Sequence, residues 1–186
     1  LSGGVPVGIP TSADHGFKLL PEQLKACITP RTKALILPYP NNPTGGIMER
    51  ADLEALAEVL KDTDILVISD EIYSELTYGG RKHVSFFSKT YAMTGWRMGY
   101  ACAPAPIAKL MCKIHQFTIL CAPVQGQAAA AEALRAGRED NYASVEKMRK
   151  VYDQRRRIML DGFAKMGLPC FEPLGAFYVF PNIAGL

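Results

Sequence analysis

The sequence is 186 residues long, and its 48% hydrophobic and 21% charged residues are typical of a folded globular protein and exclude a disordered or collagen-like chain. The formal net charge of +3, from 21 basic and 18 acidic residues, is too balanced to indicate nucleic-acid binding or attachment to a membrane surface. Five scattered cysteines without a CxxC pair argue against a disulfide framework and favour a reducing cytoplasm, and no apolar run approaches the ~18 residues of a membrane helix.

The first half of the chain alternates apolar runs with helical patterns. Residues 5–9 are β-prone, and residues 21–28 begin with a proline suited to the first position of a short helix. Apolar runs over 34–37 and 65–68 predict two buried strands. Between them, residues 49–61 predict an amphipathic helix, because apolar side chains recur at i, i+3, i+4 and i+7. These side chains are Leu53, Leu56, Ala57 and Leu60.

The second half of the chain is mostly helical in pattern. Residues 106–117 and 125–135 predict two helices, and residues 141–166 predict a longer one. Strands are expected at Phe171 and over 176–180. The order strand, loop, helix, strand is that of an α/β domain with a mostly parallel sheet, and a long helix followed by strands indicates passage into a second domain.

Two further features receive structural interpretations. The basic run over 147–157 is expected to lie on the solvated side of the long helix rather than to bind nucleic acid. Its buried face is expected to hold Val151, Ile158 and Phe163. Cys112 and His115 share a helix face, but two ligands do not make a metal site. We therefore predict no metal and expect both residues to be buried in an apolar core.

Chemically active residue types gather after the two predicted strands and in the segment that follows, and ligands of open α/β sheets bind beyond the carboxyl ends of the strands. The candidate residues are Asn42, Asp70, Tyr73, Ser88, Lys89 and Arg97. A carboxylate can keep a ring nitrogen protonated, an amide and a phenol can hydrogen-bond a ring oxygen, and an arginine can bind a phosphate. A lysine can form a Schiff base. Together these are the recognition groups for pyridoxal 5′-phosphate.

Four segments carry a family resemblance, in the family's order: PNNPTGG, SDEIYSEL, SKTYAMTGWRMGY and EPLGAFYVFP. They resemble the class I/II aminotransferases, which are fold-type-I pyridoxal-phosphate enzymes, and most closely the branch with bacterial aspartate and aromatic aminotransferases. The resemblance covers essentially the whole chain and implies a three-layer α/β sandwich with a mostly parallel sheet. Residues 1–140 would be part of the cofactor-binding large domain, 141–165 a long inter-domain helix, and 166–186 the start of a smaller α+β domain.

The resemblance also implies a role for each matching residue. Lys89 would form the Schiff base with the cofactor and then move the proton at the substrate Cα. Asp70 would pair with the pyridine nitrogen, while Tyr73 and Asn42 would hydrogen-bond the 3′ oxygen. The bond between Asn42 and Pro43 is expected to be cis, as it often is in the family.

The phosphate site and the spacing of the motifs complete the comparison with the family. Arg97, together with Ser88, is implied to bind the cofactor phosphate. The 19 residues from Asp70 to Lys89 are fewer than family members have, and Phe86 stands where a small or polar residue is usual. We expect the natural chain to carry additional residues between the aspartate and the lysine.

The leading hypothesis is a pyridoxal-phosphate-dependent aminotransferase, which moves an amino group from an amino acid, of aspartate or aromatic type, to a 2-oxo acid by a ping-pong Schiff-base mechanism. The resemblance implies a homodimer. Two alternatives stay open: a carbon–sulfur lyase or synthase on the same scaffold, and a truncated, non-catalytic remnant. Because the sequence begins with LSGGVPVGIP and stops at PNIAGL, both in the middle of a pattern, we expect an internal piece of a longer protein.

Overall fold

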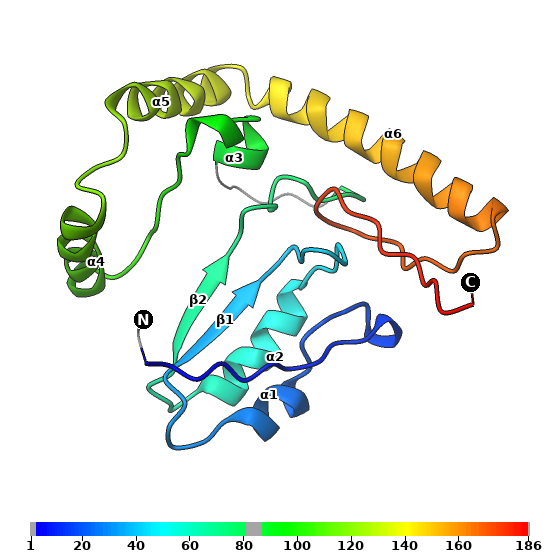
Figure 1. Cartoon of the computed structure of the whole chain (residues 1–186), viewed down its shortest axis with the longest axis horizontal. Coiled ribbons are helices and arrows are strands. Elements are labelled where there is room, and N and C mark those ends of the chain that lie inside the picture. The colour runs from blue at the N-terminus through cyan, green and yellow to red at the C-terminus, as the bar shows by residue number, and fades with distance from the viewer. Residues whose placement is uncertain (1–2, 81–86, 186) are drawn as a thin grey trace.

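The computed structural model describes residues 3–80 and 87–185, and it contains a two-stranded parallel sheet (Figure 1). Strand β1 (Ala34–Pro38) pairs with strand β2 (Leu66–Asp70), and helix α2 (Arg50–Leu60) lies between them in the chain. This strand–helix–strand unit confirms the predicted α/β class and parallel sheet, with boundaries within two residues of those expected from the apolar pattern.

Helix α1 (Pro21–Cys27) and helix α2 pack on one face of the sheet and build its core. The buried side chains of this core are Leu19, Leu24, Leu37 and Leu56. On the opposite face, the register pairs Ile36 with Ile68, which are 66% and 46% exposed. The prediction of two buried strands is therefore wrong for this face, because no described residues cover it, whereas parallel sheets are usually covered on both faces. Leu53 of α2 also points to solvent at 43% exposure.

Three segments expected to be strands do not form strands. Residues 5–9 are extended without a ladder, which fits two prolines and a glycine in and beside that run. Phe171 and residues 176–180 lie in irregular backbone, where the nearest pairings are isolated bridges between Thr77 and Gly175 and between Cys170 and Pro181. These C-terminal residues bind to loops of the first half of the chain instead of to a sheet edge.

The second half contains four helices within the described residues, and the three longer ones lie where helices were predicted. They are α3 (Phe87–Thr90), α4 (Ala105–Thr118), α5 (Val124–Glu139) and α6 (Ala143–Lys165). Two short 3₁₀ turns also occur, η1 (Ala13–His15) and η2 (Thr94–Trp96). In Figure 1, α6 runs across the top of the view with the C-terminal segment beneath it. Within the described ranges, no helix is both long and apolar enough to cross a membrane.

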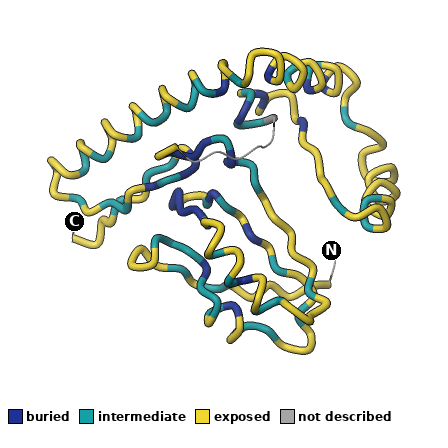
Figure 2. The backbone as a smooth tube through the Cα atoms, turned by 180° about the vertical axis from the view of Figure 1, so that it is seen from behind, coloured by how far each residue is buried: buried dark blue, intermediate teal, exposed yellow. Residues whose placement is uncertain are grey.

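Helix α4 differs from what its apolar sequence predicts. Figure 2 shows it exposed along nearly all of its length, and none of its residues is buried. Cys112 and His115 are both exposed, so the expectation that they are core residues is wrong. The described chain places no apolar surface against this helix.

Helix α6 turns a different face inward from the one predicted. Val151 and Ile158, expected in the core, are 38% and 70% exposed. The inward positions instead include Val145, which is 4% exposed, and Arg149 and Arg156, which contact loops beneath the helix. Polar side chains therefore hold this helix in place, and their spacing follows the helical period as well as apolar side chains would.

Candidate functional site

Three segments far apart in sequence meet beneath α6, and we call them the clasp: residues 41–46, 73–78 and 173–178. The Gly45 carbonyl accepts hydrogen bonds from the backbone N–H groups of Leu174 (3.1 Å) and Gly175 (2.9 Å). A Cβ on Gly45, whose φ is +70°, would lie 2.2 Å from the Pro173 Cβ. Only glycine allows this approach, which explains the glycine of the NPTGG motif in structural terms.

The middle segment of the clasp is bound to the C-terminal one through Tyr78. Its backbone N–H donates to the Leu174 carbonyl (3.0 Å), and its hydroxyl donates to the Ala176 carbonyl (2.6 Å). Burial raises the pKa of the Tyr78 phenol to about 12, so the hydroxyl stays a donor at neutral pH. The Arg156 guanidinium lies 4.9 Å from the centre of the Tyr78 ring, within cation–π range.

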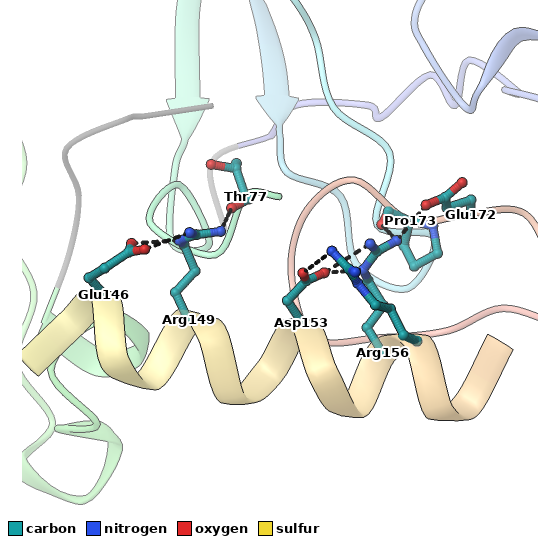
Figure 3. A network of polar contacts seen from close by, with 8 residues as sticks. Thr77, Glu146, Arg149, Asp153, Arg156, Glu172 and Pro173 are labelled. Carbon is teal, nitrogen blue, oxygen red and sulfur yellow. Dashed lines mark hydrogen bonds and ion pairs between the residues drawn. The ribbon is translucent and has the colours of Figure 1, made fainter. Parts of the chain in front are cut away.

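Charged side chains of α6 reach from the helix to the clasp, as Figure 3 shows. Arg156, with a side chain only 9% exposed, pairs with Asp153 and Glu172, both at 2.9 Å, and donates to the Pro173 carbonyl (3.1 Å). Arg149 pairs with Glu146 and donates to the carbonyl of the 73–78 segment at Thr77 (3.2 Å). A half-buried guanidinium that donates to several acceptors fixes the orientation of α6 relative to the clasp as well as neutralising charge.

The clasp brings an amide and two phenols together. The Tyr73 and Tyr178 hydroxyls are 2.7 Å apart, and the Asn42 Nδ2 donates to the Tyr178 hydroxyl at 3.3 Å. The peptide bond between Asn42 and Pro43 is cis, as expected. Two predicted site residues, Asn42 and Tyr73, thus share a third partner from the opposite end of the chain.

Lys89 lies next to this group. It comes from the short helix α3, and its Nζ is 5.7 Å from the centre of the Tyr73 ring and 5.3 Å from that of Phe177. The two rings meet edge to face, with centroids 5.3 Å apart. Aromatic faces attract an ammonium at such distances. The lysine amine therefore lies within reach of both aromatic rings, one of which carries the hydroxyl of Tyr73.

The pKa of Tyr73 shows that Asp70 lies close enough to the clasp to act on it. Burial raises the pKa of the Tyr73 phenol, the hydrogen bond with Tyr178 raises it further, and the Asn42 amide partly offsets both effects. The negative charge of Asp70 also raises it. Asp70 ends β2, is exposed, and accepts a hydrogen bond from the Ile72 backbone N–H (3.3 Å).

Ser88 and Arg97 form a second group around α3 and η2. Arg97 Nη1 donates to the Thr94 carbonyl (3.0 Å), and the Thr94 hydroxyl donates to the Ser88 carbonyl (2.9 Å). The Ser88 hydroxyl donates to the Met98 carbonyl (3.4 Å). Arg97 is exposed, and no contact within the described ranges joins it to the Asn42 amide, so this group is separate from the phenols.

Sequence reasoning missed two residues of the site, Phe177 and Tyr178. Both lie in EPLGAFYVFP, which served only as a family signature and a predicted strand. Two adjacent aromatics after the close-packed Gly175 are the signal that was available. Phe86, three residues before the lysine, lies outside the described residues.

The chemistry of this donor set fits pyridoxal phosphate. An amine, an exposed carboxylate, an amide and a phenol lie at or near the clasp, at Lys89, Asp70, Asn42 and Tyr73, and the second group supplies the exposed guanidinium of Arg97. These are the groups needed for an aldehyde, a ring nitrogen, a ring oxygen and a phosphate.

Comparison with known proteins defines the class. A family model for aminotransferase class I and II matches residues 1–186, and the chain belongs to this family. It is 42% identical to an aspartate aminotransferase of Pyrococcus abyssi, over 98% of this chain and 50% of that protein. It is 39% identical to aromatic-amino-acid aminotransferase 2 of Thermococcus litoralis, with the same coverage.

Solved structures agree with this assignment. An aromatic aminotransferase of Pyrococcus horikoshii matches with a TM-score of 0.91 and 40% identity, over 97% of this chain and 52% of the other. The aspartate aminotransferase of Thermus thermophilus with maleate matches with a TM-score of 0.88 and 40% identity, over 95% and 49%. The fold is therefore that of these aminotransferases, and the chain spans about half the length of the relatives it matches.

Proposed function

We propose that the protein containing this chain is a pyridoxal-phosphate-dependent aminotransferase, which moves an amino group from an amino acid to a 2-oxo acid in a ping-pong reaction. The observation that carries the proposal is the placement of the Lys89 amine beside the group formed by Asn42, Tyr73 and Tyr178. The names of the relatives support an aspartate or aromatic amino acid as donor.

The proposed roles follow from the chemistry of each side chain. When bound, pyridoxal phosphate supplies an aldehyde that condenses with amines and a ring that withdraws electrons. Lys89 would hold the cofactor covalently and later move the proton at the substrate Cα. Asp70 would keep the ring nitrogen protonated through its negative charge. Tyr73 and Asn42 would donate hydrogen bonds to the ring oxygen.

The phosphate would bind at the second group of residues. Arg97 is exposed and uses one donor on the Thr94 carbonyl, which leaves further guanidinium donors for an anion. Ser88 precedes the lysine directly in the chain, and its hydroxyl can donate to the same anion. The aldehyde and the phosphate arm of the cofactor are on adjacent ring carbons, so a phosphate site next to Lys89, together with Asp70 at the ring nitrogen opposite the aldehyde, would orient the ring.

Domain organisation, assembly and location are part of the same proposal. Residues 1–140 would belong to the cofactor-binding large domain, 141–165 to an inter-domain helix that includes α6, and 166–186 to the small domain. The family resemblance supports a homodimer. The five scattered cysteines support a cytoplasmic location.

The test is covalent labelling of the full-length protein. It is incubated with pyridoxal phosphate, reduced with borohydride and mapped by peptide mass. We expect a pyridoxyl group on Lys89, loss of that label in Lys89→Ala, and full labelling in Lys147→Ala, which changes an exposed lysine of α6. An assay with aspartate or phenylalanine and a 2-oxo acid then measures amino transfer.

The same experiment separates the alternatives. A labelled lysine without net amino transfer would favour a lyase or synthase on this scaffold, which supports more than one reaction. An unlabelled protein would favour a non-catalytic remnant, for which the short interval from Asp70 to Lys89 is the supporting observation. The alignment with the Pyrococcus abyssi enzyme needs 198 positions to cover 98% of a 186-residue chain, so that relative has residues that this sequence lacks.

A further inference from the structure

Tyr178 occupies the centre of the hydrogen-bonded group at the site. Its hydroxyl oxygen accepts a hydrogen bond from Asn42 Nδ2 (3.3 Å) and lies 2.7 Å from the hydroxyl of Tyr73. It is thereby the common partner of the two side chains proposed to bind the ring oxygen of the cofactor. A group that contacts both can set the direction of both.

The number of protons in this group limits how the hydrogen bonds run. Each phenol has one proton to donate and can accept two hydrogen bonds. If Tyr73 donates to Tyr178, its proton is used and it has none for a ligand. If Tyr178 donates to Tyr73, the Tyr73 proton is available, and the second N–H of Asn42 is available as well. Only this second arrangement leaves a free donor on each of the two side chains proposed to bind the ring oxygen, Tyr73 and Asn42.

We propose that Tyr178 is a positioning residue that donates to the Tyr73 hydroxyl, accepts from the Asn42 amide, and so directs the remaining donors of both toward the ring oxygen of the cofactor. This inference deepens the proposed function and rests on it. A hydroxyl that accepts one hydrogen bond also donates a stronger one, so Tyr178 strengthens the donor as well as aiming it.

The surroundings of Tyr178 keep its hydroxyl in place. Ala176, two residues before it, is fully buried, and its carbonyl accepts the Tyr78 hydroxyl (2.6 Å). The neighbouring Phe177 ring stacks on Tyr152 of α6, with centroids 5.6 Å apart and an interplanar angle of 23°. The two residues that precede the tyrosine are therefore fixed, which supports a positioning role.

The bound cofactor would report the effect of Tyr178 through its visible absorption. Hydrogen bonds to the ring oxygen stabilise its negative charge, so the oxygen holds the proton on the neighbouring Lys89 nitrogen less strongly. Weaker or misdirected donors let that nitrogen keep its proton to a higher pH. For Tyr178→Phe, which removes one neutral hydrogen-bond donor, we expect the midpoint pH of the absorption change to rise by about 0.5 to 1.

The experiment is a spectroscopic pH titration of the full-length protein loaded with pyridoxal phosphate. Wild type is compared with Tyr178→Phe and with Tyr152→Phe, a control that removes a hydroxyl from the ring stacked on the other side of Phe177. The double variant Tyr73→Phe/Tyr178→Phe tests the route of the effect. If Tyr178 acts through Tyr73, adding Tyr178→Phe to Tyr73→Phe should move the midpoint by less than half of its effect in wild type.

The outcomes distinguish this inference from the proposed function. A wild-type protein that shows no cofactor absorption would overturn the proposed function, and the inference with it. A normal wild-type titration with the same midpoint in Tyr178→Phe and Tyr152→Phe would overturn the inference alone. Full additivity in the double variant would do the same. If Tyr178→Phe does not fold, Tyr178→Trp, which keeps a donor on an aromatic ring, must titrate closer to wild type than Tyr178→Leu.

Discussion

The clasp and helix α4 differ in how far their apolar side chains are covered. In the clasp, Leu76, Tyr78 and Ala176 are at most 1% exposed, and the polar groups between them are hydrogen-bonded. In α4, Ile114 and Phe117 are 65% and 85% exposed (Figure 2). The clasp is therefore determined by contacts inside these residues, whereas α4 is determined only by its own backbone hydrogen bonds. The candidate site lies in the clasp, where the described residues contact one another.

The largest effect is expected from placing a methyl group in the clasp. Gly45→Ala puts a Cβ 2.2 Å from Pro173 and 2.7 Å from the Gly175 carbonyl, in a left-handed backbone. We expect a loss of about 2 to 4 kcal/mol in unfolding free energy, from overpacking and backbone strain together. Gly162→Ala in α6 is the matched control, because nothing lies within 4 Å of the added atom. Denaturant unfolding of both variants measures the difference. Equal unfolding free energies would contradict the close packing of Gly45 against Pro173.

Removal of the guanidinium that joins α6 to the clasp should have the next largest effect. Arg156→Ala removes one of the two arginine partners of Asp153 and the donor to the Pro173 carbonyl, and it uncovers the Tyr78 ring. We expect a loss of about 2 to 3 kcal/mol, below the full cost of breaking a buried pair, since Glu172 is exposed. Arg157→Ala removes a 72% exposed partner of Asp153 and should cost less than about 1 kcal/mol. Thermal and denaturant unfolding would measure the difference.

The same ion pairs predict a smaller, pH-dependent effect. Burial alone would raise the pKa of Asp153, but the hydrogen bonds from Arg156 and Arg157 outweigh it and hold the pKa below its ordinary value. The folded state therefore binds fewer protons than the unfolded state, and this stabilisation is lost as pH falls below about 4. The stability gap between wild type and Asp153→Asn should narrow on acidification, as followed by urea unfolding at several pH values. A stability difference that widens on acidification would show that folding raises the pKa of Asp153 instead of lowering it.

Helix α4 should give the smallest effect. Ile114→Gln exchanges a 65% exposed side chain for a polar one of good helix propensity. With the helix open as it is here, we expect a change within about 0.5 kcal/mol in unfolding free energy. Leu56→Gln in the core beneath the sheet, where the side chain is 3% exposed, is the contrasting variant. A loss above about 1 kcal/mol for Ile114→Gln in the full-length protein would show that other residues cover this face.

Local pattern predicted the elements of this fold well. The helix over 49–61 appears as Arg50–Leu60, and the run over 34–37 appears as Ala34–Pro38, because the period of apolar residues reflects backbone geometry within one element. The pattern failed for 176–180, whose β-prone residues bind to loops. Strand propensity describes residues that fit a sheet, and the presence of a neighbouring strand is a tertiary property.

By itself, the sequence determined the family motifs, the longer helices and the choice of Asn42, Tyr73 and Lys89 as candidate site residues. Only the tertiary structure decided that Tyr178, 136 residues after Asn42, lies between the first two, and that α6 presents Arg149 and Arg156 to the clasp rather than Val151 and Ile158. The reason is physical: the side chains that meet across such a distance are selected by which backbones can approach closely, and here two glycines and a set of hydrogen bonds permit the approach.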